Sequence, residues 1–188
     1  MKKRIVGVDE TGRGALAGPI VAAAVLIIKP KLFPHNEVRD SKELTDIERR
    51  RLFLILEHAC RVEYGIVDNE YIDRAGIQPA NVLAVELALQ RMQAARHRIC
   101  CDYIGGFQRY TSFNFTISLH KKGEAKFPEI AAASIMAKVF RDNVMISLGR
   151  KYTLYLFDRH KGYGTEHHRK LVKRYGYSPV HRLSFSSR

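Results

Sequence analysis

Hydrophobic residues along the chain form short apolar runs that are separated by polar segments. The run Pro19–Ile28 is rich in valine, alanine and isoleucine, which is typical of a strand buried on both faces. The shorter run Arg4–Asp9 predicts a strand before it, and the glycines between the two runs predict a hairpin. Further strands are predicted in the same way at Arg61–Val67, Arg98–Ile104 and Phe113–Leu119.

Helix signals occupy the segments between and after these strands. Thr45 and Glu48 have the spacing of a capping box, and proline or threonine marks other helix starts. The predicted helices cover Thr45–Ala59, Asn69–Ala75, a segment starting at Pro79, a long segment starting at Pro128, and Thr165–Gly176. An order of strands first and alternating helices and strands afterwards predicts an α/β fold with a mixed sheet.

The composition is that of one folded domain. Of 188 residues, 46% are hydrophobic and 27% are charged, and we expect a single domain over residues 1–188. The longest apolar stretch, Ile20–Ile28, is too short to cross a bilayer, and the start of the chain lacks a signal-peptide pattern. Cys60, Cys100 and Cys101 suggest neither a disulfide framework nor a zinc site. These features predict a cytoplasmic protein without a membrane anchor.

Positive charge is concentrated towards the end of the chain. The formal net charge is +13, from 32 basic and 19 acidic side chains, which favours a polyanionic partner such as nucleic acid. Residues 141–188 hold 11 basic and 3 acidic residues and so contribute +8. A solvated basic face would have the same composition, whereas a membrane surface is disfavoured because no amphipathic apolar stripe accompanies the charge. We expect this basic helical part to contribute to nucleic-acid binding.

Four carboxylates occur where predicted strands or loops end. Asp9 and Glu10 end the first strand, Asp102 follows an apolar run, and Glu124 lies in a loop before the long helix. Open α/β sheets gather functional groups at strand ends, and carboxylates gathered there need a cation or a proton to offset their repulsion. Taken singly, Asp102 is a typical turn residue and Glu124 a typical solvated one. Together with a basic surface, the four predict a Mg²⁺ or Mn²⁺ site for phosphoryl transfer.

A longer pattern joins these residues to segments along the whole chain, namely Gly7–Gly14, Asp40–Lys42, Pro128–Asp142, His160–Thr165 with His168, and His181–Phe185. In this order the segments resemble type 2 ribonuclease H, the ribonuclease HII family. The resemblance covers both ends of the chain and is far more specific than one short motif. It implies a ribonuclease H-like fold, with a central mixed β-sheet flanked by helices.

The resemblance also implies an endoribonuclease. Its expected action is to cut the RNA strand of RNA–DNA hybrids, and to cut 5′ to ribonucleotides embedded in duplex DNA, leaving 3′-hydroxyl and 5′-phosphate ends. Asp9, Glu10 and Asp102 match the metal-binding catalytic carboxylates of the family, which use Mg²⁺ or Mn²⁺, expected here as two ions. Glu124 stands where the family commonly has aspartate, and Tyr103 stands where it usually has glycine. Glutamate keeps the charge but lengthens the side chain.

Substrate contacts follow from the same resemblance. Ribose recognition is expected from the Gly12-Arg13-Gly14 turn and Tyr163, since glycines allow close backbone approach and a tyrosine offers a ring and a hydroxyl. The 2′-hydroxyl is the group that distinguishes RNA from DNA. Backbone phosphate contacts are expected from Ser41, Lys42 and Lys161, which predicts little base specificity and a strong salt dependence.

Other polar residues of the matching segments have weaker signals. Ser134 and Lys138, four residues apart on the long helix, could reach the site or serve helix packing. Asp142 is expected in an ion pair or behind the site, and Glu129 in a structural role at the helix start. The histidines at 160, 167 and 168 make a poor zinc site, so we expect them at the surface or facing DNA.

Two alternatives remain at this point. Ribonuclease HIII generally has an additional N-terminal domain and lacks arginine in the glycine turn, whereas this chain begins its first strand at Arg4 and has Arg13. A non-catalytic nucleic-acid-binding protein would satisfy the charge, but carboxylates inside its binding surface would weaken binding. We expect a monomer. No docking tail for a protein partner, such as a sliding clamp, is evident after Phe185.

Overall fold

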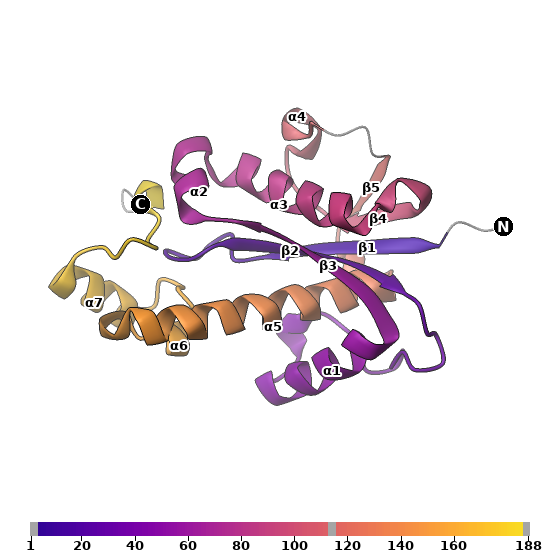
Figure 1. The fold of residues 1–188 in the computed structure, drawn as a ribbon, viewed down its shortest axis with the longest axis horizontal. Helices are drawn as coiled ribbons and strands as arrows, with labels where there is room; N and C mark the ends of the chain where they lie inside the picture. Colours follow the sequence, from indigo (N-terminus) through magenta and orange to yellow (C-terminus); the bar gives the residue numbers. More distant parts are fainter. Residues whose placement is uncertain (1–3, 113–115, 186–188) are drawn as a thin grey trace.

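A five-stranded mixed sheet forms the centre of the protein in the computed structural model, which describes residues 4–112 and 116–185. The strands lie in the order β3-β2-β1-β4-β5, so the first strand is central (Figure 1). β1 is antiparallel to β2 and parallel to β4, which makes the sheet mixed as predicted. The strands are β1 (Ile5–Thr11), β2 (Ile20–Ile27), β3 (Cys60–Val67), β4 (Arg98–Asp102) and β5 (Ile117–His120).

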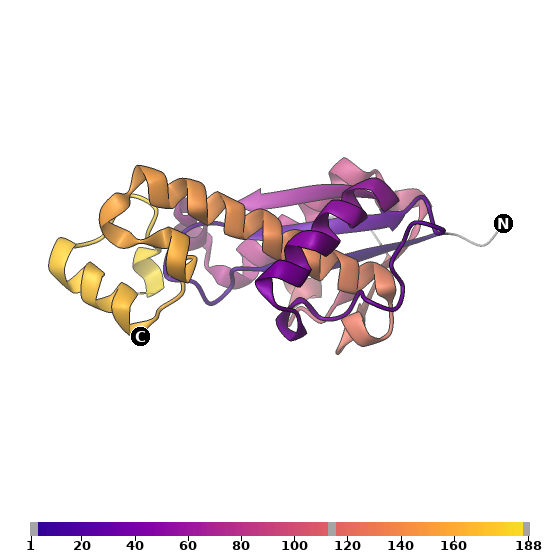
Figure 2. The ribbon, with the colours of Figure 1, turned by 90° about the horizontal axis from the view of Figure 1, so that it is seen from below.

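Helices cover both faces of this sheet. The long α5 and the neighbouring α1 lie on one face, while α3 with α2 and α4 lies on the other (Figure 1). α6 and α7 lie beyond one end of the sheet, next to the end of α5 (Figure 2). The helices are α1 (Asp46–Ala59), α2 (Asn69–Ala75), α3 (Ile77–Met92), α4 (Phe107–Tyr110), α5 (Pro128–Lys151), α6 (Phe157–His160) and α7 (Glu166–Tyr175).

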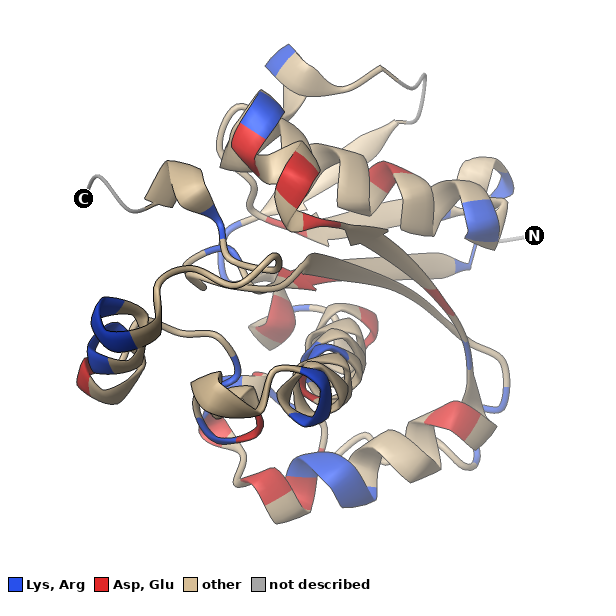
Figure 3. Ribbon diagram, turned by 60° about the vertical axis from the view of Figure 1, so that its left-hand side comes forward, with Lys and Arg blue, Asp and Glu red and all other residues tan. Residues whose placement is uncertain are grey.

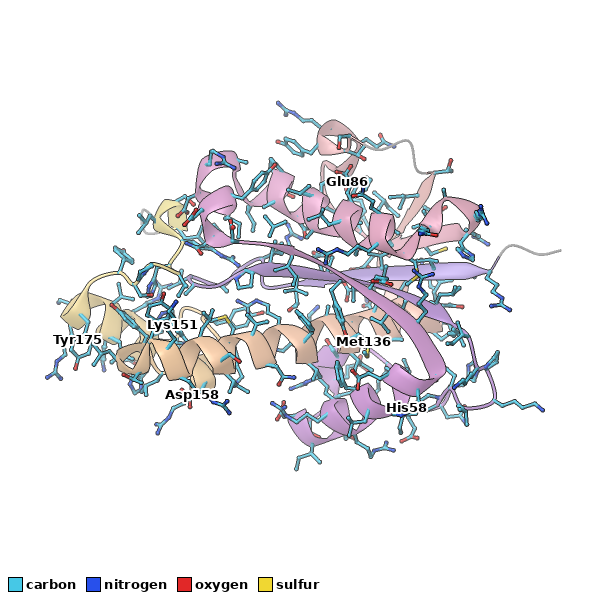
Figure 4. The ribbon with its side chains drawn as sticks, viewed as in Figure 1. His58, Glu86, Met136, Lys151, Asp158 and Tyr175 are labelled. Atoms are coloured by element: carbon cyan, nitrogen blue, oxygen red, sulfur yellow. The ribbon has the colours of Figure 1, made fainter. Side chains whose placement is uncertain are left out.

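Two apolar cores separate the sheet from its helices. One core packs α3 against β1 and β2, and the other packs α1 and α5 against the opposite face, with Met136 on that side and Glu86 on the α3 side (Figure 4). Gly7 and Gly65 allow the helices to lie directly on the strands. A Cβ at Gly7 would meet the Glu129 backbone at 2.2 Å, and one at Gly65 would meet the Ala84 carbonyl oxygen at 1.8 Å. The small residues of α5 therefore press against β1, which carries the predicted carboxylates.

Local signals in the sequence correspond to the observed ends of several helices. The capping box of Thr45 and Glu48 is present, and the Thr165 hydroxyl caps α7. Gly76 and Gly176 end α2 and α7 with positive φ values of 90° and 76°, which glycine adopts without strain. No helix within the described ranges combines the length and the hydropathy that a membrane crossing needs.

Some predicted boundaries were wrong by a few residues. β1 continues past Asp9 to Thr11, because it remains paired with β2 as far as Val21. β4 ends at Asp102, two residues before the predicted end, and α3 begins at Ile77 rather than at the proline. The predicted start of the fifth strand, Phe113, lies outside the described residues, and β5 is observed from Ile117 onward.

The different lengths of β1 and β4 create an opening beside the central strand. β4 pairs with β1 only as far as Cys101 opposite Val8. β1 then continues for three more residues along β2 alone, with Asp9 opposite Ala23. The carboxyl end of β4 therefore leaves the last part of β1 uncovered on one side, where a ligand can approach.

Candidate active site

A cleft of about 360 Å³ lies at this opening. It brings together segments that are far apart in the sequence: the ends of β1 and β4, the glycine turn, the loop before α1, the middle of α5 and the loop before α7. Its lining residues are Asp9, Glu10, Thr11, Gly12, Arg13, Gly14, Ser41, Lys42, Arg49, Asp102, Tyr103, Ser134, Lys138 and Tyr163. Nine of the eleven predicted site residues are among them; Glu124 and Lys161 are not.

Asp9 and Glu10 reach this one cleft from opposite faces of β1. Asp9 accepts a hydrogen bond from Ser134 on α5, and its Oδ1 also accepts from the Glu10 backbone N–H at 2.7 Å. Glu10 faces α3, where Nδ2 of Asn81 donates to its Oε1 at 3.2 Å. Successive strand residues alternate between faces, so two neighbours can line one cleft only where the sheet is open at the side. The early end of β4 provides that opening.

Asp102 is held at the end of β4 by the turn that leads to α5. Its Oδ1 accepts a hydrogen bond of 3.0 Å from the backbone N–H of Gly123. A Cβ at Gly123 would lie 2.8 Å from the end of the Ile130 side chain and 3.4 Å from Asp102 Oδ1, so a larger residue here would require Ile130 to shift. Glu124 follows in the same 3₁₀ turn and is half-buried, one residue away from the contact with Asp102. The loop before α5 thus lies against one cleft carboxylate without contributing to the lining.

The cleft carboxylates raise one another's proton affinity. Burial and the nearby charge of Glu10 raise the pKa of Asp9 well above its usual range, against the hydrogen bond from Ser134. Burial also raises the pKa of Glu10, although Arg13, 3.6 Å away, and Asn81 act in the opposite direction. Asp102 adds repulsion to both groups. The positive charge of Arg13 therefore does not offset the burial and mutual repulsion of these carboxylates.

A divalent cation suits this donor set. Carboxylate oxygens are hard ligands of the kind that Mg²⁺ and Mn²⁺ prefer, and a cation would relieve the repulsion that raises these pKa values. Within residues 4–112 and 116–185, no three side chains of histidine, cysteine, aspartate or glutamate are grouped closely enough to form a ready-made cage. The residues of the cleft lining that could hold an ion are Asp9, Glu10 and Asp102. Glu124 lies outside the lining, directly after Gly123, whose N–H binds Asp102.

A pair of serines links the loop before α1 to Asp9. The hydroxyls of Ser41 and Ser134 lie 2.8 Å apart, and both residues are buried. When Asp9 is ionised it can only accept, so Ser134 then donates to it and Ser41 donates to Ser134. Arg49 fixes the same loop from α1 by donating to the backbone oxygen of Ser41 at 2.8 Å. Ser41 thus lines the cleft with its hydroxyl hydrogen-bonded to Ser134.

The glycine turn and Tyr163 lie side by side in the lining of the cleft. Ala15 forms an isolated antiparallel bridge with Tyr163, which places the tyrosine next to the turn. The guanidinium of Arg141 lies 5.3 Å from the centre of the Tyr163 ring, and the ammonium of Lys138 lies 5.5 Å from it. These cations stack on the ring and restrict its position.

Three lysines predicted or considered for substrate contact differ in their surroundings. The side chain of Lys42 is 89% exposed at the cleft, with its ammonium 3.9 Å from Asp40, so it can reach a phosphate from this loose ion pair. Lys138 forms an ion pair of 2.8 Å with Asp142, which confirms the ion pair expected for Asp142. Lys161 donates through its ammonium to the backbone oxygen of Asp158, and it lies outside the cleft lining.

The expectation that the histidines lie at the surface was wrong for His168. His168 is fully buried, it stacks on the half-buried His160 at 4.1 Å, and only His167 is exposed. Nδ1 of His168 donates to the backbone oxygen of Tyr163 at 2.9 Å, so its Nε2 accepts from Nε2 of His181 at 3.0 Å. Burial lowers the pKa of His168 to about 4 and keeps this pair neutral. The histidines therefore form an internal support for the Tyr163 loop.

Sequence reasoning missed several residues that support the cleft. Asn81 is fully buried on α3, and Arg141 and Arg182 are almost wholly buried cations behind the glycine turn. One signal for Asn81 was available, because a polar residue on the apolar face of a helix needs a partner. Both arginines lie in the segments that match the family pattern, but the sequence assigns them no role, since their partners are backbone oxygens that only the fold brings near.

The fold and the cleft together define the class. A mixed sheet whose central strand is β1, with helices on both faces and carboxylates at the ends of two adjacent strands, is the ribonuclease H-like fold. The family model described as ribonuclease HII matches residues 6–188. The chain belongs to the ribonuclease HII family, and it is a ribonuclease H-type endonuclease that acts on RNA–DNA hybrids.

Relatives and solved structures agree with this assignment. The chain is 42% identical to the ribonuclease HII of Acetivibrio thermocellus over 185 residues, which span 98% of this chain and 70% of that protein. It is 39% identical to the ribonuclease HII of Endomicrobium trichonymphae over 183 residues, which span 97% of this chain and 85% of that protein. The ribonuclease H2 of Pyrococcus horikoshii superposes with a TM-score of 0.76 and 26% identity, over 95% of this chain and 92% of that one. The ribonuclease HII of Archaeoglobus fulgidus, solved in a complex with PCNA, shares the fold with a TM-score of 0.81, 23% identity, and coverage of 96% and 94%.

Proposed function

We propose that this endonuclease also cuts duplex DNA on the 5′ side of an embedded ribonucleotide, leaving 3′-hydroxyl and 5′-phosphate ends. The observation that carries the proposal is the arrangement of one cleft, where Asp9, Glu10 and Asp102 lie beside the Gly12–Gly14 turn and Tyr163. Acidic groups suited to a divalent ion therefore adjoin groups suited to a ribose. A single ribonucleotide presents both a 2′-hydroxyl and a scissile phosphate to such a cleft.

In this proposal Asp9, Glu10 and Asp102 hold divalent cations, and Glu124 joins them from the loop after Gly123. A pair of bound Mg²⁺ or Mn²⁺ ions supplies an activated water and charge stabilisation for the leaving 3′-oxygen. Ser134 and Asn81 keep the carboxylates of Asp9 and Glu10 aimed into the cleft. No side chain becomes covalently attached to the substrate.

The remaining groups position the nucleic acid. The Gly12-Arg13-Gly14 backbone and Tyr163 recognise the ribose, and Arg13, whose side chain is 41% exposed, is available to a phosphate. Lys42 and Ser41 line the cleft from the loop before α1. Lys161 lies outside the lining, two residues before Tyr163, and would contact a phosphate at the edge of the cleft. α7 carries Arg169, Lys170, Lys173 and Arg174, and its basic turns project beyond the sheet (Figure 3). This basic part provides phosphate contacts without base reading.

The test is a duplex DNA with a single embedded ribonucleotide, incubated with the full chain and Mg²⁺ or Mn²⁺. We expect one cut, 5′ to the ribonucleotide, with end groups identified by ligation and phosphatase treatment. An all-DNA duplex of the same sequence should remain intact, and Asp102→Asn should bind the substrate without cutting it. Cleavage of a long RNA–DNA hybrid by a folded protein that leaves the single ribonucleotide uncut would overturn the proposal.

A further inference from the structure

Two arginines are buried behind the Gly12–Gly14 turn, and their described hydrogen bonds go to backbone oxygens rather than to carboxylates. Arg141 is fully buried and Arg182 is 1% exposed. The planar guanidinium has five donors in a fixed fork, which suits it to hold several carbonyl groups at once. Burial, and then the charge of Arg141, lowers the pKa of Arg182 to about 9, so that Arg182 is still a cation at neutral pH.

Arg182 binds the turn itself. Its Nη1 donates to the carbonyl oxygens of Gly12 at 2.7 Å and Arg13 at 3.1 Å. Its Nε and Nη2 both donate to the carbonyl oxygen of Gly18, at 3.0 and 2.8 Å. One side chain near the end of the sequence thus ties the turn to the start of β2.

These contacts fix the direction of two peptide groups. In a trans peptide the C=O and the N–H point in opposite directions. The carbonyls of Gly12 and Arg13 point towards the buried guanidinium, so the N–H groups of Arg13 and Gly14 point away from it, and both residues line the cleft. Among the described residues neither N–H donates a hydrogen bond. A Cβ at Gly14 would meet no atom within 4 Å, so the space beside it is open.

We propose that Arg182 is a positioning residue for ribose recognition, which holds the Gly12–Gly14 turn so that the N–H groups of Arg13 and Gly14 face the substrate. The inference rests on the ribose recognition proposed above. It adds that one side chain, far away in the sequence but in contact with the turn, sets the orientation of the backbone groups that bind the ribose. Without Arg182, the carbonyl of Arg13 loses its described donor and that of Gly12 keeps only the N–H of Ala15 at 3.3 Å, so the peptide groups of the turn are freer to rotate.

Arg141 has a related but separate task. Its three nitrogen groups donate to the backbone oxygens of Ala17 at 3.1 Å, Pro19 at 2.9 Å and Lys161 at 2.9 Å. It therefore joins the loop after the turn to the loop before Tyr163, and it binds neither carbonyl that sets the two free N–H groups. Of the two arginines, only Arg182 binds the carbonyl groups of Gly12 and Arg13 and so orients their peptide groups.

The experiment compares binding of two duplexes that differ by one 2′-hydroxyl. Asp102→Asn is used as the background, so that the ribonucleotide duplex stays uncut, and its dissociation constants for the ribonucleotide duplex and the all-DNA duplex are measured by fluorescence anisotropy. The added variant is Arg182→Lys, which keeps the charge but cannot span Gly12 and Gly18 from one point. We expect the preference for the ribonucleotide duplex to fall by about tenfold, while the affinity for all-DNA duplex stays within twofold.

Asn69→Ala is the matched control. Nδ2 of Asn69 donates to the backbone oxygens of Pro179 at 3.0 Å and His181 at 3.1 Å, so its loss loosens the same terminal segment without removing a charge near Arg182. The preference should then be unchanged. An undiminished preference in folded Arg182→Lys, or an equal loss in Asn69→Ala, overturns the inference. Equal binding of both duplexes by the Asp102→Asn background overturns ribose recognition itself, and the inference with it.

Hydrogen exchange tests the same inference if Arg182→Lys does not fold. In the Asp102→Asn background, the amides of Arg13 and Gly14 should exchange rapidly in the free protein. The ribonucleotide duplex should slow them by at least tenfold more than the all-DNA duplex does. Equal protection by both duplexes, or amides that are already protected in the free protein, would contradict the proposed orientation of the turn.

Discussion

Nδ2 of Asn81 donates a hydrogen bond of 3.2 Å to Oε1 of Glu10, and this contact joins helix α3 to the acidic end of β1. Asn81 is fully buried, and its Oδ1 has no hydrogen-bond partner among the described residues. A buried side-chain amide whose oxygen lacks a hydrogen-bond partner lowers the stability of the folded protein. The position of Asn81 is therefore explained by its contact with the Glu10 carboxylate and not by stabilisation of the core. The contact fixes the direction in which Glu10 faces the cleft.

Replacing Asn81 with alanine should therefore lower kcat more than it changes KM. Groups that orient metal-binding side chains typically contribute 10- to 100-fold to metal affinity or activity, and we expect a loss of about that size. Steady-state cleavage of an RNA–DNA hybrid measures both constants. Gln90→Ala, on the exposed side of the same helix, is the control and should be neutral. A kcat for Asn81→Ala within twofold of wild type would contradict the orienting role.

Asp102 and Glu124 should differ in the size of their effect. Asp102 lines the cleft, whereas Glu124 lies in the turn beyond Gly123 and outside the lining. We expect Asp102→Asn to lower cleavage by about 10³-fold and Glu124→Gln by only about tenfold. Titration of Mn²⁺ and Mg²⁺ against cleavage rate should show that Glu124→Gln needs more metal. An equal loss in both variants would mean that Glu124 reaches the reacting phosphate as closely as Asp102.

Tyr163 should govern the choice of sugar more than the strength of DNA binding. Its ring lies against Arg141 and its loop lies beside the glycine turn. Tyr163→Ala should lower the preference for a ribonucleotide duplex over all-DNA duplex by about tenfold, and leave all-DNA binding within threefold. Tyr163→Phe keeps the ring and separates its contribution from that of the hydroxyl. A uniform loss of affinity for both duplexes would assign the ring to general backbone contact.

The fold was predictable from the sequence to the extent that local signals determine it. The buried run that became β2 and the capping box at Thr45 appear in the structure as expected, because each depends on neighbouring residues. The end of β1 was wrong because pairing with β2 continues past Asp9, and such pairing is not visible in β1 itself. Local pattern thus predicts which elements exist, while partners decide where they end.

The cleft shows the same division. Asp9, Glu10 and Asp102 could be predicted because carboxylates at strand ends are conspicuous in the sequence and match a family pattern. The arginine at 182 could not be assigned a role, because its partners at 12, 13 and 18 lie more than 160 residues away along the chain. His168 was misjudged because histidine among basic residues is typical of a surface, whereas α7 turns this side chain inward onto His181.

His168 gives the last prediction, on the pH dependence of stability. Burial, followed by the charges of His160, His181 and Arg169, outweighs the hydrogen bond to Tyr163 and lowers its pKa from 6.5 to about 4. Between these values the unfolded chain binds a proton that the folded protein excludes. The contribution of His168 to the free energy of unfolding is therefore fully present above about pH 7. The free energy of unfolding should fall by on the order of 3 kcal/mol as the pH drops towards 4. Urea unfolding from pH 8 to pH 4 measures this fall.

The neighbouring histidine provides the control for this prediction. His167→Gln changes an exposed side chain and should leave the pH profile unchanged. His168→Gln removes the buried titrating group, so it should flatten the profile between pH 7 and pH 4 and lower the stability at pH 8. The pKa values of His160 and His181 are also lowered by burial, so part of the slope should persist in His168→Gln. A profile as steep as that of the wild type would place the acid sensitivity elsewhere in the protein.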